Sequence, residues 1–309
     1  MSTISPKQIY DIVSEKVIGQ EEAKKLVCNS FFMHFSSYIH GLMEGKMIPR
    51  SNALLMGPTG SGKTFIIREA AKAAQSLLEL PIFPIMEIDC TEISSRGWEG
   101  DNLSDKLRQF HRACDKKGDI FDTGVVFLDE FDKLCKPAIG RGGTDHNRNT
   151  QYNLLKMTEG MQMEGEADTG NLLFIFAGNF SEIRAKRAED AKPKQAMGFT
   201  SGSDNKRPYV DYHTELDKAG MVTQLVGRTP HVGQLYELKQ KELKQILEEM
   251  LIPEVASIWN FLGEDISLTN RQKNKMVKDC FQRRTGARGL RADLSKALED
   301  QIFNMTLKL

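Results

Sequence analysis

The chain has 309 residues, 40% of them hydrophobic and 27% charged, which is enough apolar material for one large domain or two ordinary ones. Its 42 Lys and Arg residues balance 42 Asp and Glu residues, so no overall field attracts nucleic acid or an anionic membrane surface. The sequence shows neither a membrane-spanning apolar run nor the apolar block of a signal peptide. Five scattered cysteines without a C-x-x-C motif argue against a disulfide framework or a zinc module, and we expect a cytoplasmic protein.

Apolar spacing predicts alternating helices and strands in the first half of the chain. In chain order they are a helix over 20–35, a strand over 52–56, a helix over 63–80, a strand over 85–88 and a helix that carries Leu103, Leu107 and Phe110. Two uninterrupted apolar runs, 124–128 and 172–177, are typical of strands buried on both faces of a parallel sheet. Strands that alternate with helices predict a three-layer α/β/α domain.

The second half of the chain has a different character. Residues 181–220 are polar and show no periodicity, which marks a long loop that is either functional or mobile. Residues 231–238 predict an edge strand. From Lys239 onward the apolar spacing is helical throughout, with one helix over 243–251 and another over 290–302. We therefore expect two domains, an α/β domain over 1–238 and a small all-α domain over 239–309.

The segment "GPTGSGKT" fits the G-x-x-x-x-G-K-[ST] phosphate loop and lies between an expected strand and an expected helix. Its residues are Gly57, Pro58, Thr59, Gly60, Ser61, Gly62, Lys63 and Thr64. The glycines let backbone N–H groups turn toward phosphates, and the helix N-terminus adds a positive dipole. Lys63 is expected to contact the β- and γ-phosphates of a nucleotide, and Thr64 to bind Mg²⁺. The alternative is a plain Gly-rich turn that opens a helix.

The segment "VVFLDEFDK" places two carboxylates at the end of a buried strand, where ligands bind in open α/β sheets. Asp129 is expected to hold the Mg²⁺ shell. Glu130 is expected to polarise a water for attack on the γ-phosphate. A solvated acidic turn is the alternative, and the phosphate loop makes the catalytic interpretation the stronger one.

These motifs and their order resemble the AAA+ ATPases, in particular the ClpX/HslU group of protein unfoldases, over nearly the whole chain. In "VIGQEEAKK", the resemblance implies that Val17 and Ile18 lie against adenine. In "GRTP", it makes Arg228 an arginine finger that reaches the neighbouring subunit's nucleotide. In "TGARGLR", it places Arg288 near the γ-phosphate as a sensor-2 residue of a helical lid. An ordinary surface charge is the alternative for each arginine.

The resemblance also gives a place to an unusual tryptophan on a Gly-rich polar turn. Members of the group carry an aromatic residue in a loop that lines a central pore and grips polypeptide. The segment "GWEG", which comprises Gly97, Trp98, Glu99 and Gly100, occupies that position. The alternative is that Trp98 folds back into a local core.

The sequence departs from the group in four respects. The 309 residues include no counterpart of the N-terminal zinc-binding domain, so the resemblance does not carry that domain's adaptor interactions over to this chain. Residues 161–170 are short and acidic where ClpX has a longer, basic pore loop. Asn179 follows the fourth strand where close relatives often have alanine, and it is a candidate sensor-1 residue. The tripeptide Met197-Gly198-Phe199 matches only weakly the segment with which ClpX docks on its ClpP-type peptidase, and incidental similarity is the alternative.

The sequence thus predicts an ATP- and Mg²⁺-dependent remodeller or unfoldase that acts on protein substrates as a homo-oligomeric, hexameric ring, without membrane attachment. A finger that acts in trans requires heterologous contacts, which close into rings. One alternative is a remodeller of a particular complex that works without a peptidase. The other is a nucleic-acid-associated motor or loader, for which the basic residues of the long loop are the only support; they are Lys186, Arg187, Lys192, Lys194, Lys206 and Arg207.

Overall fold

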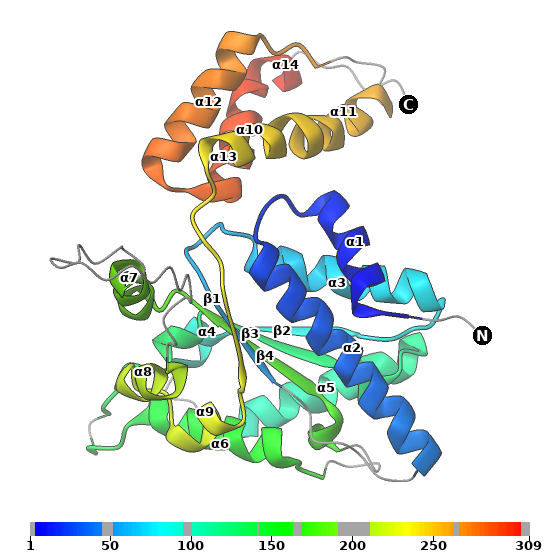
Figure 1. Ribbon diagram of the computed structural model, residues 1–309, viewed down its shortest axis with the longest axis vertical. Coiled ribbons are helices and arrows are strands. Elements are labelled where there is room, and N and C mark those ends of the chain that lie inside the picture. The colour runs from blue at the N-terminus through cyan, green and yellow to red at the C-terminus, as the bar shows by residue number, and fades with distance from the viewer. Residues whose placement is uncertain are drawn as a thin grey trace, which may run out of the picture.

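The computed structural model describes residues 4–44, 52–94, 101–140, 142–162, 168–190, 211–261 and 266–303. Its α/β part forms the lower half of Figure 1, and the C-terminal helices stand above it, joined by an extended connection after β5. Of the helices in these described ranges, none is both long and apolar enough to cross a membrane.

A five-stranded sheet forms the centre of the α/β part, in the order β2-β3-β4-β1-β5. The strands are β1 (Ala53–Met56), β2 (Ile85–Asp89), β3 (Val125–Asp129), β4 (Leu173–Gly178) and β5 (His231–Gln234). Every pair of neighbours is parallel. The parallel sheet confirms the predicted α/β class, and β5 is the expected edge strand, although it ends at Gln234 rather than Leu238.

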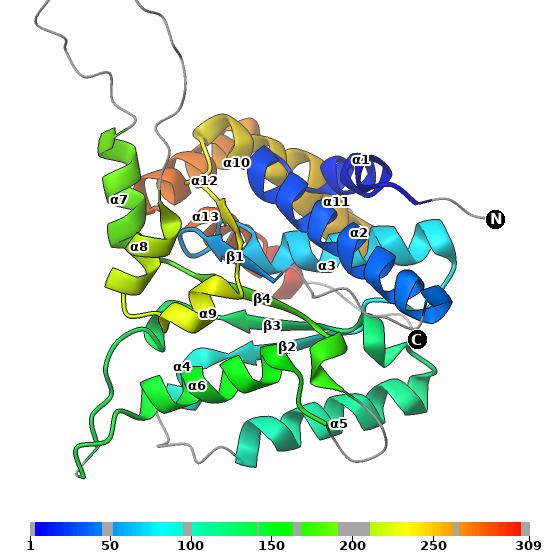
Figure 2. The ribbon, with the colours of Figure 1, turned by 60° about the horizontal axis from the view of Figure 1, so that its bottom comes forward.

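Helices cover both faces of this sheet, as Figure 2 shows for α2 and α3 on one side and α5 and α6 on the other. The first group comprises α1 (Pro6–Lys16), α2 (Glu21–Glu44) and α3 (Lys63–Leu78). The second comprises α4 (Cys90–Ser94), α5 (Asp101–Lys117), α6 (His146–Glu159), α7 (Ser181–Asp190), α8 (Tyr212–Lys218) and α9 (Thr223–Gly227). Short 3₁₀ turns, at Phe121–Thr123, Phe131–Lys133 and Thr169–Asn171, complete the connections.

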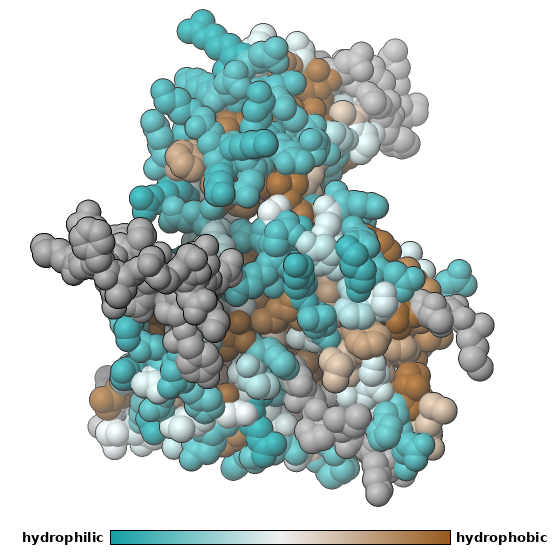
Figure 3. Space-filling view, in the orientation of Figure 1, coloured by the Kyte–Doolittle hydropathy of each residue, from teal (hydrophilic) through white to brown (hydrophobic). Residues whose placement is uncertain are grey.

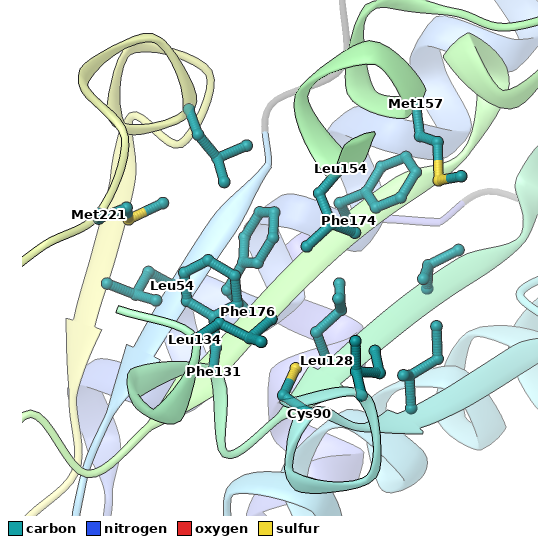
Figure 4. Packing of buried hydrophobic residues seen from close by; sticks show 14 of the residues in the cluster. Leu54, Cys90, Leu128, Phe131, Leu134, Leu154, Met157, Phe174, Phe176 and Met221 are labelled. Carbon is teal, nitrogen blue, oxygen red and sulfur yellow. The ribbon is translucent and has the colours of Figure 1, made fainter. Parts of the chain in front are cut away.

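Successive strand residues point to opposite faces of the sheet, so the side chains of each buried strand pack into two separate hydrophobic cores. Leu54 and Phe176 belong to the core beneath α5 and α6, where Figure 4 shows them beside Leu128 and Leu154. Leu55 lies in the other core, under α1–α3. Because both faces are covered, the three central strands β1, β3 and β4 have no polar face, which explains the continuous apolar runs of their sequences.

Local signals in the sequence explain where several helices begin and end. Ser5 caps α1 by accepting a hydrogen bond from the Gln8 amide, with Pro6 in the first turn. Helix α3 ends at Leu78 because Glu79 adopts a left-handed conformation, before Pro81 could stop it. The first helix of the prediction, 20–35, is wrong in extent, since α2 continues to Glu44.

The regular secondary structure described after β5 is entirely helical. They are α10 (Gln240–Ile246), which continues through a π turn (Leu247–Leu251) into α11 (Ile252–Phe261), then α12 (Asn270–Arg283), α13 (Gly286–Ala297) and α14 (Glu299–Phe303). The helix predicted over 290–302 is interrupted at Leu298. These helices bury their own core from Leu238 to Leu298, and on the face in Figure 3 they present mostly hydrophilic residues.

The prediction of a long irregular loop over 181–220 is wrong at both ends. Residues 181–190 form α7, and residues 212–218 form α8. Ile183 and Leu216 are buried in the core beneath α5 and α6, but each helix is short and contributes little apolar surface. A single buried residue per helix gives too weak a periodic signal for the sequence pattern to detect.

Candidate functional site

Three neighbouring strands end side by side in polar residues. Strand β1 leads into the phosphate loop, β3 ends at Asp129, and β4, which lies between them, leads into Asn179. The Gly57 amide donates to the Gly178 carbonyl at 3.0 Å, which ties the ends of β1 and β4 together. The parallel sheet therefore gathers the residues that the sequence motifs predict at one edge.

The phosphate loop runs from β1 to the N-terminus of α3, and its lysine is folded into the loop. Lys63 Nζ donates to the Gly57 carbonyl at 2.9 Å and to the Pro58 carbonyl at 3.1 Å. The side chain is buried, and burial lowers the pKa of Lys63, an effect that Asp129 and Glu130 partly oppose. A buried ammonium that touches only carbonyl oxygens is available to exchange them for phosphate oxygens.

A hydroxyl and a carboxylate face each other beside this loop. Thr64 Oγ1 lies 3.5 Å from Asp129 Oδ2, and Asp129 Oδ1 accepts a hydrogen bond from the Glu130 amide at 2.9 Å. Hard oxygen ligands of this kind suit Mg²⁺, which usually takes one or two protein ligands and completes its shell with water and phosphate oxygens. The two residues predicted to hold the metal thus fit that ion.

The residue after Asp129 has an unusual backbone. Glu130 lies in the left-handed region with φ of 55°, which is uncommon for a residue with a side chain. Its carboxylate is 3.7 Å from Lys133 Nζ, and Lys133 also pairs with Asp132 at 3.3 Å. Conformations of this kind cluster at functional sites, which favours a chemical role for Glu130 over a plain solvated turn.

Hydrogen bonds hold both the backbone and the side chain of Asn179. Its amide N–H donates to Asp132 Oδ1 at 3.0 Å, and its side-chain Oδ1 accepts from Arg184 Nη2 at 2.7 Å. A Cβ on the preceding Gly178 would lie 2.7 Å from Asp132 Oδ1, so only glycine permits this close approach. The end of β4 is therefore packed directly against the turn that carries Glu130.

A cavity of about 730 Å³ lies between the end of the sheet and the C-terminal helices. Its volume is within the range of sites for small molecules and cofactors. Residues of four predicted motifs line it together, namely Val17, Ile18, Ser61, Gly62, Thr64, Asp129 and Arg288. Apolar residues at the start of the helical part also line it, namely Leu238, Ile246, Met250 and Leu251. The lining thus combines apolar side chains suited to a base with polar groups suited to phosphates.

The helical part touches the phosphate loop directly. The Ala287 amide donates to the Gly60 carbonyl at 3.2 Å. A Cβ on Gly60, whose φ is 77°, would lie 2.6 Å from the Thr285 carbonyl oxygen, so the two backbones approach as closely as glycine allows. The "TGARGLR" segment, which carries Arg288, therefore lies against the loop that the sequence predicts to bind phosphate.

One side chain joins three parts of the site that are distant in sequence. Gln20 Nε2 donates to the Tyr236 carbonyl at 2.8 Å and to the Ser61 carbonyl at 3.3 Å, and Gln20 Oε1 accepts from the Tyr236 amide at 3.0 Å. Gln20 thereby connects the segment of Val17 and Ile18, the phosphate loop and the link to the C-terminal helices. The sequence analysis missed this residue because nothing in its local pattern marks a contact across 216 positions.

Arg228 lies at the opposite end of the sheet. It lies three residues before the start of β5, and Asn52 Nδ2, at the start of β1, donates to its carbonyl at 3.0 Å. The phosphate loop begins after β1 has ended, about 16 Å further along at ~3.3 Å per residue. The Arg228 guanidinium is half exposed and pairs with Glu159 at 3.1 Å, a partner that sequence reasoning also missed. The structure does not bring Arg228 to its own chain's cavity.

Two predicted sites lie outside the described residues. They are the pore-loop residues Gly97, Trp98, Glu99 and Gly100 and the tripeptide Met197-Gly198-Phe199.

Comparison with known proteins agrees with this geometry. Residues 53–187 match the ATPase family associated with various cellular activities (AAA), and residues 238–309 match the C-terminal, D2-small domain of ClpB protein. The chain is 28% identical to the ATP-dependent Clp protease ATP-binding subunit ClpX of Azotobacter vinelandii, over 97% of this chain and 74% of that protein. It is 26% identical to the ClpX of Porphyromonas gingivalis strain ATCC 33277, over 97% and 77%, and 27% identical to that of Borrelia duttonii strain Ly, over 97% and 74%.

Proposed function

Because this chain belongs to the AAA+ ATPases of the ClpX/HslU group, we propose that it is an ATP-dependent unfoldase or remodeller of proteins that works as a ring. The cavity carries this proposal most directly, since it joins the phosphate loop, Asp129 and the C-terminal helices around one space of nucleotide size. We divide the chain into an α/β nucleotide-binding domain, 1–238, and an α-helical lid, 239–309. The separate core of the C-terminal helices supports this division.

The residues at the sheet edge take distinct roles in the proposed hydrolysis. Lys63 leaves the carbonyls of its own loop and contacts the β- and γ-phosphates, while Thr64 and Asp129 hold Mg²⁺. Bound Mg²⁺ neutralises charge that develops on the phosphate oxygens. Glu130 orients the attacking water and accepts its proton. Asn179, beside Glu130, takes the sensor-1 role and contacts the γ-phosphate or that water.

The lid and the neighbouring subunit complete the site in this proposal. Val17 and Ile18 contact adenine at the apolar end of the cavity, and Arg288 approaches the γ-phosphate from the lid. Arg228 acts as an arginine finger on the nucleotide of the next subunit, because its own phosphate loop lies at the other end of the sheet. A contact that joins opposite ends of two identical subunits is heterologous and closes into a ring, here a hexamer.

The proposed substrates are proteins gripped by Trp98 in the pore. Trp98→Ala is expected to retain basal ATP hydrolysis and to lose ATP-driven unfolding of a stably folded, tagged substrate. If Trp98 were instead a core residue, its replacement would destabilise the protein by about 3–5 kcal/mol and reduce ATPase activity in parallel. Unfolding assays and thermal melts of the same variant separate these two roles.

We further propose that the protein acts in the cytoplasm, in accord with five buried, free cysteines. We also propose that a ClpP-type peptidase docks on Met197-Gly198-Phe199. It predicts that Phe199→Ala abolishes stimulation of such a peptidase and spares ATPase activity. No association between the wild-type protein and such peptidases would instead favour a remodeller that works alone.

The nucleic-acid alternative loses part of its support in the structure. Two of the six basic residues on which it rested are engaged within the protein: Arg187 donates to Gln234 at 2.5 Å, and Lys186 pairs with Glu215. Glu215 offsets the charge of Lys186, and Gln234 occupies a donor of Arg187 that could otherwise bind a phosphate.

The proposed function is tested most simply by an unfolding assay. Wild-type protein is expected to unfold a tagged substrate only with hydrolysable ATP, whereas Glu130→Gln is expected to bind ATP and substrate without unfolding it. Unfolding that proceeds without nucleotide hydrolysis would contradict the proposal.

A further inference from the structure

Arg184, in the first turns of α7, binds Asn179 at two points. Arg184 Nε donates to the Asn179 carbonyl at 2.8 Å, and Arg184 Nη2 donates to Asn179 Oδ1 at 2.7 Å. The guanidinium is a rigid planar fork, so two such bonds fix the position of both the backbone and the side chain of their acceptor. Asn179 is thereby held in one orientation.

The contact also decides which side of the Asn179 amide is presented to the site. The side-chain oxygen is used by Arg184, so the Nδ2 group with its two hydrogens points elsewhere. Among the residues that the structure describes, none accepts a hydrogen bond from Asn179 Nδ2. A free NH₂ group is the half of the amide that can donate to a phosphate oxygen or to a water.

On its other side, Asn179 is connected to the catalytic turn. Its amide donates to Asp132, which pairs with Lys133, and Lys133 in turn lies 3.7 Å from Glu130. The network therefore extends from α7 to the turn that carries the expected general base.

Side-chain contacts fix helix α7 against the rest of the domain, and they thereby fix the position of Arg184. Arg187 donates to Gln234 at 2.5 Å and lies over the Tyr212 ring, 4.9 Å from its centre, and Lys186 pairs with Glu215. Contacts to β5 and α8 hold the helix from two directions. A positioning group needs a fixed support of this kind.

We propose that Arg184 is a positioning residue that turns the NH₂ group of Asn179 toward the γ-phosphate and the attacking water. This inference rests on the proposed function, since it assigns the orientation of the sensor in that same site. Arg184 itself contacts neither the nucleotide nor the water. Its removal leaves ATP binding in place and lets the Asn179 amide rotate, which slows the chemical step.

The test compares Arg184→Ala, Arg184→Lys, Asn179→Ala and the double variant Arg184→Ala/Asn179→Ala. Each is assayed for ATP affinity and for single-turnover hydrolysis at saturating ATP, with Arg112→Ala, an exposed arginine of α5, as the control. Arg184→Ala is expected to lower the hydrolysis rate about 10-fold, in line with the loss of charge-assisted hydrogen bonds, with ATP affinity changed less than about threefold. Arg184→Lys should recover little, because an ammonium cannot form the two parallel bonds.

The double variant decides between positioning and direct contact. If Arg184 acts through Asn179, the double variant is no slower than Asn179→Ala alone. Independent, multiplicative losses, or a large loss of ATP affinity in Arg184→Ala, would show that Arg184 contacts the nucleotide itself and would overturn the inference. A normal rate in Arg184→Ala beside a slow Asn179→Ala would also overturn it, while leaving the proposed function intact. A normal rate in Asn179→Ala would remove the sensor role and the inference together.

Discussion

The carboxyl and amino ends of the same parallel sheet carry very different sets of candidate functional residues. At the carboxyl end, the phosphate loop, Asp129 and Asn179 lie on adjacent strands, and the lid packs against them around one cavity. At the amino end, the expected catalytic group is Arg228, whose half-exposed side chain forms an ion pair with Glu159. One end gathers the residues that we propose bind the nucleotide, and the other carries the half-exposed guanidinium of Arg228.

This difference supports our proposal that hydrolysis is divided between subunits. The Arg228 backbone lies about 16 Å from the phosphate loop of its own chain along the strand direction, so in our proposal the finger at that loop comes from another subunit. The pair with Glu159 is exposed, and such pairs contribute only about 0–1 kcal/mol, so releasing Arg228 toward a neighbour costs little. In our proposal the amino end therefore supplies half of a second copy's site.

The largest effect is expected at the amino end itself. Arg228→Ala should leave folding and ATP binding intact and lower hydrolysis by about 10³–10⁵, the contribution of arginine fingers in comparable ATPases and GTPases. Steady-state ATPase assays and nucleotide-binding titrations measure the two properties separately. A loss of ATP affinity equal to the loss of rate would mean that Arg228 serves nucleotide binding instead.

At the carboxyl end, Glu130→Gln should retain ATP binding and lower the hydrolysis rate by about 10²–10⁴, because the amide can no longer accept the proton of the attacking water. Lys63→Ala provides the contrast, since it removes a group that contacts the phosphates in the ground state and should abolish binding. Near-normal turnover in Glu130→Gln would remove Glu130 from the mechanism.

A smaller effect is expected from Gln20, which ties the carboxyl end to the lid. Gln20→Ala removes three hydrogen bonds to backbone groups, at about 0.5–1.5 kcal/mol each, and should weaken ATP binding roughly 10-fold or more. Gln245, which bonds to Glu249 on the lid surface, gives a matched control in Gln245→Ala. Equal ATP affinities in the two variants would separate Gln20 from the site.

The smallest effect is expected from the partner of the finger. Glu159→Gln should change the hydrolysis rate by no more than about fivefold, because an exposed ion pair is worth at most about 1 kcal/mol. The measurement is ATPase activity at low and high salt, which screens such pairs. A loss comparable to that of Arg228→Ala would mean that Glu159 is part of the catalytic apparatus rather than a resting partner.

Much of the carboxyl end could be predicted from sequence, because its residues occur in short, contiguous motifs attached to apolar strands. The phosphate loop, Asp129 and Glu130 lie at the strand ends where those patterns placed them. Contacts between distant side chains carry no such signature. Gln20 meets Tyr236, and Arg228 meets Glu159, across 216 and 69 positions. Arg184 was missed because α7, with one buried residue, left no periodic pattern.

The central claim, that one active site combines the carboxyl end of one subunit with the amino end of the next, is tested by mixing two inactive proteins. Glu130→Gln subunits supply a normal Arg228, and Arg228→Ala subunits supply a normal Glu130. Random mixing at equal amounts should restore ATPase activity to about a quarter of the wild-type rate, since one interface in four then joins two intact halves. A mixture no more active than either variant alone, in rings shown to contain both subunits, would contradict the account.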